Sequence, residues 1–110
     1  MPRRDWKIRI HDMLKAIEAV QHYTAGMTFV DFTADRKTVD AVVRNLIVIG
    51  EAAARVPDEV CLYHPGIPWR EIRGMRNFVI HEYFGVSDRI LWDTIQINLA
   101  ALEGLLRKVL

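Results

Sequence analysis

Apolar residues recur every three or four positions in several separate stretches of this chain, the spacing that places them on one face of an α-helix. The pattern runs through residues 5–24, through 36–56 and from about 89 to 110. A further helical stretch begins near Trp69 and is expected to end at or near Tyr83. No stretch shows the strict alternation of a half-buried β-strand. Four helical patterns without a strand pattern predict an all-α bundle.

Turn and capping residues separate these stretches. Residues 28–34 are predicted to be a loop, and residues 57–68, which contain three prolines, a connector. The candidate capping residues are Gly26 after the first helix, Thr33 or Asp35 before the second, and Ser87 or Asp88 before the last.

The stretch at 36–56 is apolar around most of its circumference, which predicts the central, most buried helix. One polar stripe interrupts it, formed by Asp40, Arg44, Glu51 and Arg55. Two interpretations of this stripe stay open. It is either a solvated face with ion pairs at four-residue spacing, or Arg44 or Glu51 faces a partner subunit or an active cleft.

The composition limits the classes of protein that fit. With 110 residues, 51% of them hydrophobic, the chain is expected to form one globular domain over residues 1–110. A formal charge of +1 means that nucleic-acid binding would need a local basic patch. The single cysteine, Cys61, and the lack of a signal-peptide pattern or membrane-length apolar run predict a soluble cytoplasmic protein with no membrane association. Because no metal-ligand or cofactor-loop motif is found, we expect neither a metal nor a cofactor.

The segment from Arg76 to Tyr83 carries the most chemistry. Arginine binds phosphate through a planar fork of donors, and a histidine such as His81 can move a proton near neutral pH. Arg76 and His81 would point about 140° apart on an ideal helix, so one helix does not bring them together as a tight pair. Asn77 shares a face with His81. Two copies of this helix meeting across a two-fold axis would form a composite cleft, which predicts a homodimer.

Arginines also recur every three residues at the start of this helix, at Arg70, Arg73 and Arg76. They predict a cationic stripe that could hold a few phosphates. The competing interpretation makes them surface charges and makes His81 a hydrogen-bonding residue without a catalytic role.

The spacing of these residues resembles a known motif. Arg76 and His81, separated by four residues, match the arginine–histidine signature of the HEPN superfamily, and His81-x-Tyr83 resembles its HepT-like branch. The segments 49–52 (Ile-Gly-Glu-Ala) and 64–69 (His-Pro-Gly-Ile-Pro-Trp) resemble the surroundings of the motif in that family. The chain departs from the family in two places. In the family an acidic residue often follows directly after the segment that corresponds to residues 83–86, whereas here Ser87 intervenes before Asp88. Residues 99–102 also lack a proline that many relatives have.

The resemblance implies a HEPN-type bundle of four or five helices that forms a homodimer. It implies the toxin of a type VII toxin–antitoxin system, a metal-independent endoribonuclease acting on RNA. Arg76 and His81 would be catalytic, while Asn77, with Arg73 and Arg70, would support RNA binding. The partner would be a cognate MNT-type nucleotidyltransferase antitoxin, which would transfer AMP to Tyr83.

A different class of function fits the same residues. A non-catalytic HEPN module could use Arg76 and His81 to bind a nucleotide or a protein, as a partner of the nucleotidyltransferase. In a third interpretation the chain is chiefly the substrate of that transferase. Sequence cannot separate these, because binding and cutting a phosphodiester use the same residue types.

Overall fold

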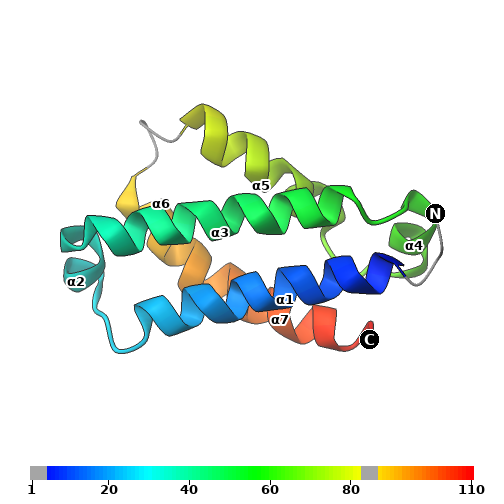
Figure 1. The fold of residues 1–110 in the computed structure, drawn as a ribbon, viewed down its shortest axis with the longest axis horizontal. Coiled ribbons are helices and arrows are strands. Elements are labelled where there is room, and N and C mark those ends of the chain that lie inside the picture. Colours follow the sequence, from blue (N-terminus) through cyan, green and yellow to red (C-terminus); the bar gives the residue numbers. More distant parts are fainter. Residues whose placement is uncertain (1–4, 83–86) are drawn as a thin grey trace.

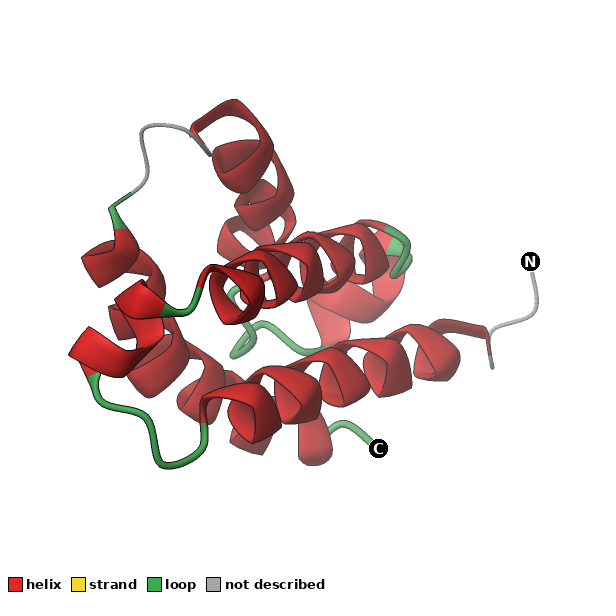
Figure 2. Ribbon diagram, turned by 60° about the vertical axis from the view of Figure 1, so that its left-hand side comes forward, coloured by secondary structure: helices red, strands yellow, loops and turns green. Residues whose placement is uncertain are grey.

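A computed structural model describes the backbone of residues 5–82 and 87–110 and the side chains of residues 6–77 and 87–110. Every regular element in this part of the chain is helical, so the predicted all-α class is confirmed (Figure 2). The elements are α1 (Asp5–Thr24), α2 (Phe29–Ala34), α3 (Arg36–Ala54), α4 (Asp58–Tyr63), α5 (Trp69–Glu82), α6 (Asp88–Asp93), the π-helical segment η1 (Thr94–Leu99) and α7 (Ala100–Arg107).

Two short helices correct the predicted loop at 28–34 and the predicted connector at 57–68. Thr28 and Asp31 form a capping box that starts α2, each side chain accepting a hydrogen bond from the other residue's backbone N–H. α4 follows Pro57, a residue suited to the start of a helix. Both helices have six residues. Helices this short do not repeat an apolar pattern, which is why periodicity missed them.

Helix α3 is the central element, as its sequence predicted. Figure 1 shows α3 lying between α1 and α5, while α6, η1 and α7 cross behind α1 and α3. Asp35 begins α3, its carboxylate accepting a hydrogen bond from the Thr38 backbone N–H at 3.2 Å. The largest fully buried side chains of the shared core include Ile10, Met13, Ile17 and Val20 of α1, Leu46 and Ile49 of α3, and Leu99 and Leu106 of the C-terminal segment.

The last helix of the prediction is a continuous helical run that contains a π-helical segment. Ser87 caps it through a hydrogen bond from the Ile90 backbone N–H to the Ser87 hydroxyl. The Asp88 carboxylate accepts hydrogen bonds from Thr33 and Arg36, which ties the start of this run to the junction of α2 and α3. The position of α5 is set separately, by its packing against α3.

No helix in the described part of the chain has both the length and the apolar character needed to cross a bilayer.

Candidate functional site

Helices α3 and α5 approach each other closely where Gly50 meets Arg76. A Cβ atom added to Gly50 would lie 2.9 Å from both the Cβ and the backbone nitrogen of Arg76. A side chain at position 50 would therefore force the two helices apart. Because Gly50 has no side chain, α5 can lie against α3 at Arg76, the residue that begins the predicted motif.

The Arg76 guanidinium is held by two neighbours at this crossing. Its Nη1 lies 3.1 Å from Glu51 Oε1, and its Nη2 donates to Asn77 Oδ1 at 3.3 Å. The Arg76 side chain is 40% exposed, so the group is both oriented and reachable from solvent. Arginine has five N–H donors. These two bonds leave other donors of Arg76 able to meet a phosphate.

Glu51 is the residue whose role the sequence left open. The sequence predicts it either on a solvated face, paired with Arg55, or facing a partner subunit or an active cleft. The structure turns it toward Arg76 across the α3–α5 crossing. The sequence feature that singles out Glu51 is its place on the polar stripe of an otherwise buried helix. Nothing in that stripe identifies Arg76 as the partner of Glu51.

Arg73 has a different environment from the one predicted for it. Its Nε donates to the Ala53 carbonyl at 3.1 Å, and its Nη2 donates to the Val56 carbonyl at 2.8 Å. Its Nη1 lies 3.4 Å from the exposed Asp58 carboxylate. Arg73 thus binds carbonyl groups at and just beyond the C-terminal end of α3, where the Ala53 carbonyl also accepts a hydrogen bond from the Val56 backbone N–H.

Cys61 lies beside this arginine, with its sulfur 3.1 Å from Arg73 Nη2. Burial raises the pKa of the Cys61 thiol, although the positive charge of Arg73 acts in the opposite direction. A thiol with a raised pKa is mostly protonated near neutral pH and therefore a poor nucleophile.

The remaining predicted site residues are not joined to the Arg76 cluster by any described contact. Arg70 is exposed at the start of α5. His81 belongs to the last turn of α5, but its side chain lies outside the part of the chain that the structure describes, and so does Tyr83 as a whole. The structure therefore brings together Arg76, Asn77 and Glu51.

An apolar groove lies beside α5, between that helix and the C-terminal helical run. Its volume is about 530 Å³, and its lining includes Met75 of α5, Ile90 of α6, Ile97 of η1 and Leu105 of α7. Ile90 and Ile97 are 48% and 65% exposed. Large apolar side chains gathered in an exposed groove mark a surface suited to association.

Over the described residues, no three His, Cys, Asp or Glu side chains gather as a metal site would require.

The fold and the site define a class: an all-α domain with an exposed, oriented arginine at a close helix crossing. Comparison with known families makes this class specific. The sequence model of the HepT-like ribonuclease family matches residues 13–109, and the chain belongs to this family.

Individual relatives agree with the family assignment. A protein of Thermococcus cleftensis called "Probable ribonuclease HepT" is 41% identical over 107 residues, which span 97% of each chain. A protein of Caldanaerobacter subterraneus subsp. tengcongensis called "Putative RNase" is 40% identical over 92% of this chain and 90% of its own. A third, from Methanocaldococcus jannaschii and also called "Putative RNase", is 34% identical over 100% of this chain and 91% of its own. No solved structure matches the chain.

Proposed function

We propose that this protein is a metal-independent endoribonuclease and the toxin of a type VII toxin–antitoxin system in the cytoplasm. The observation that carries the proposal is the Arg76 guanidinium, half-exposed and oriented by Glu51 and Asn77 where α5 crosses α3. Membership of the HepT-like ribonuclease family supports it, as do relatives whose names describe them as ribonucleases.

In the proposed reaction, Arg76 binds the scissile phosphate and stabilises the charge that develops on its oxygens. The RNA 2′-oxygen attacks the phosphorus, and the bond from phosphorus to the 5′-oxygen breaks. His81 takes the proton from the 2′-hydroxyl, and a proton is delivered to the leaving 5′-oxygen. The products are a 2′,3′-cyclic phosphate and a 5′-hydroxyl. Asn77, which accepts a hydrogen bond from Arg76, acts as a supporting residue.

Each chain offers one motif histidine, whereas this reaction uses an acid and a base. We therefore propose a homodimer in which His81 of the second subunit supplies the other proton transfer. The apolar groove beside α5 is the surface we assign to the second copy, because it adjoins the motif helix and exposes Ile90 and Ile97.

We propose that an MNT-type nucleotidyltransferase neutralises the toxin by transferring AMP to Tyr83. The added phosphodiester would be an anion, and we propose that it competes with RNA for Arg76. The Tyr83→Phe variant removes the acceptor oxygen, so incubation with ATP and the transferase is expected to add mass to the wild-type protein and not to the variant. Equal modification of both proteins would show that the assignment of Tyr83 is wrong.

The nuclease activity is tested by incubating the purified protein with labelled RNA in the presence of EDTA, beside a His81→Ala variant. We expect cleavage by the wild type and a loss of about 100-fold or more in the variant, the usual contribution of a general acid–base. If neither protein cleaves RNA while mass spectrometry shows Tyr83 unmodified, the non-catalytic binding module becomes the better account.

A further inference from the structure

A second groove, polar in character, runs between α1 and α3. Its volume is about 630 Å³. The charged side chains that line it are Arg9, Asp12 and Lys15 of α1, Arg44 and Glu51 of α3, and Arg55, which caps the C-terminal end of α3. Four cations against two carboxylates make it the local basic surface that a chain of formal charge +1 needs in order to bind a polyanion.

The two carboxylates in this groove already have cationic partners. Asp12 Oδ2 lies 3.6 Å from Arg9 Nη1, and Glu51 Oε1 lies 3.1 Å from Arg76 Nη1. By contrast, Lys15, Arg44 and Arg55 are exposed and form no ion pair with a carboxylate of the described residues. Their charges are therefore available to an anionic ligand.

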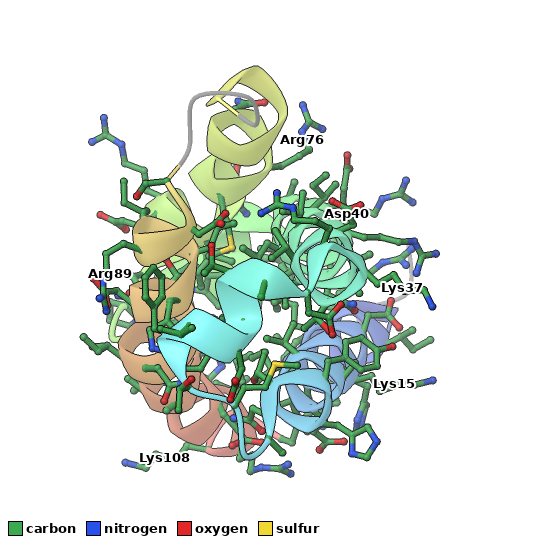
Figure 3. The ribbon with its side chains drawn as sticks, turned by 90° about the vertical axis from the view of Figure 1, so that its left-hand side faces the viewer. Lys15, Lys37, Asp40, Arg76, Arg89 and Lys108 are labelled. Carbon is green, nitrogen blue, oxygen red and sulfur yellow. The ribbon has the colours of Figure 1, made fainter. Side chains whose placement is uncertain are left out.

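Glu51 connects this groove to the candidate catalytic arginine. It lines the groove from α3 and at the same time binds Arg76, which projects from α5 on the other side of α3. In Figure 3, Arg76 lies near the top and Lys15 at the lower right, with Asp40 and Lys37 between them and Arg89 on the left. A chain lying in the groove could therefore continue over α3 to Arg76.

The cations are spread along the groove. Arg44 lies in α3, and Arg55 caps the C-terminal end of this helix eleven residues further on, which corresponds to about 16 Å along the helix axis. The helices α1 and α3 run antiparallel and side by side (Figure 1), and the groove takes its lining from both of them. This length suits several consecutive phosphates of a single strand better than one isolated phosphate.

We propose that the groove between α1 and α3 binds the phosphodiester backbone of single-stranded RNA next to the phosphate held by Arg76. This inference rests on the proposed ribonuclease function and adds the path of the substrate to it. A protein partner fits the groove less well. The centre of a protein–protein interface is usually rich in aromatic anchors, whereas this groove has no aromatic lining residue among those described and only two half-buried aliphatic ones, Ile47 and Val48.

The test compares Arg44→Ala and Arg55→Ala with Lys108→Ala. Lys108 is an exposed residue that caps the C-terminal end of α7 and does not line the groove, so this control removes one positive charge elsewhere on the surface. Binding is measured over a series of salt concentrations with a 2′-O-methyl RNA, which lacks the nucleophile and stays intact. Each groove variant is expected to bind more weakly and to reduce the slope of log affinity against log salt by about 0.7, the value for one lost contact to single-stranded phosphate. Lys108→Ala is expected to behave as the wild type.

Cleavage of a long RNA and of a dinucleotide is measured with the same proteins. Because a dinucleotide has no flanking phosphate, its cleavage is expected to be unchanged in the groove variants, while cleavage of the long RNA falls.

Three results would contradict one of the two proposals. If the wild type cleaves RNA and the groove variants bind RNA as well as the wild type does, the inference is overturned and the proposed function stands. No cleavage by the wild type, with RNA binding still weakened in the groove variants, would overturn the proposed function but support the groove as an RNA site. Loss of nucleotidyltransferase binding in place of RNA binding would make the groove a protein interface and overturn the inference.

Discussion

The three arginines at the start of α5 have three different environments. Arg70 is exposed, Arg73 donates to carbonyl groups at the end of α3, and Arg76 is held by Glu51 and Asn77. Their three-residue spacing predicted one cationic stripe. However, three residues turn a helix by about 300°, so each arginine is displaced by about 60° around the axis from the one before it. Over the two steps from Arg70 to Arg76 the rotation adds up to about 120°. It leaves Arg70 facing solvent, brings Arg73 to the C-terminal end of α3 and brings Arg76 to Glu51.

This difference predicts different effects of substitution on stability. Arg73→Ala removes the charged donor to the Ala53 and Val56 carbonyls, and we expect it to lower the free energy of unfolding by about 1.5–3 kcal/mol, the usual contribution of hydrogen bonds that involve a charged group. Arg70→Ala is the matched control and is expected to change it by less than about 0.5 kcal/mol, as at most surface positions. Urea unfolding of both variants measures this. Equal effects would mean that the Arg73 hydrogen bonds do not contribute to the fold.

At the scale of helices, sequence periodicity located the long elements but not the short ones or their crossings. The apolar repeats of α1, α3 and the C-terminal run extend over several turns, which is why their positions could be predicted. The helices α2 and α4 are a turn and a half long, and the contact between Glu51 and Arg76 joins positions 25 residues apart. Periodicity along one helix contains no information on which residue of another helix it meets. The roles of His81 and Tyr83 stay predictions.

The crossing itself is tested by adding one methyl group at Gly50. In Gly50→Ala the new Cβ would meet the Arg76 backbone, which cannot move aside as a flexible side chain could. We expect a loss of about 1–3 kcal/mol in the free energy of unfolding, typical of overpacking, and reduced RNA cleavage because Arg76 is displaced. Gly104→Ala in α7 is the control, since a Cβ there meets no atom within 4 Å, and it should be neutral or stabilising by up to about 1 kcal/mol. A Gly50→Ala protein as stable and active as the wild type would contradict the close approach.

For the whole molecule, the two grooves have different characters and different proposed occupants. The apolar groove between α5 and the C-terminal run is assigned to a second copy of the chain, and the polar groove between α1 and α3 to RNA. In this arrangement α5 lies between the subunit contact and the substrate path. Assembly and cleavage should therefore depend on each other.

A charge placed in the apolar groove is expected to prevent assembly. Ile97 is 65% exposed in the single chain, so Ile97→Glu should leave the fold intact and yield a monomer with little RNA cleavage. Val30→Glu on α2 is the control, because Val30 is 70% exposed and does not line the groove. Sedimentation velocity gives the oligomeric state of each variant. A wild-type protein that is monomeric and active would show that cleavage needs no dimer. An Ile97→Glu variant that is still a dimer would show that the subunit contact lies elsewhere.

The measurement that tests the central claim most directly is the chemical identity of the RNA ends after incubation with the unmodified protein in EDTA, with Arg76→Ala alongside. The proposed mechanism predicts a 2′,3′-cyclic phosphate and a 5′-hydroxyl from the wild type and no such ends from Arg76→Ala. A 3′-hydroxyl with a 5′-phosphate, or the same ends produced by Arg76→Ala, would contradict it.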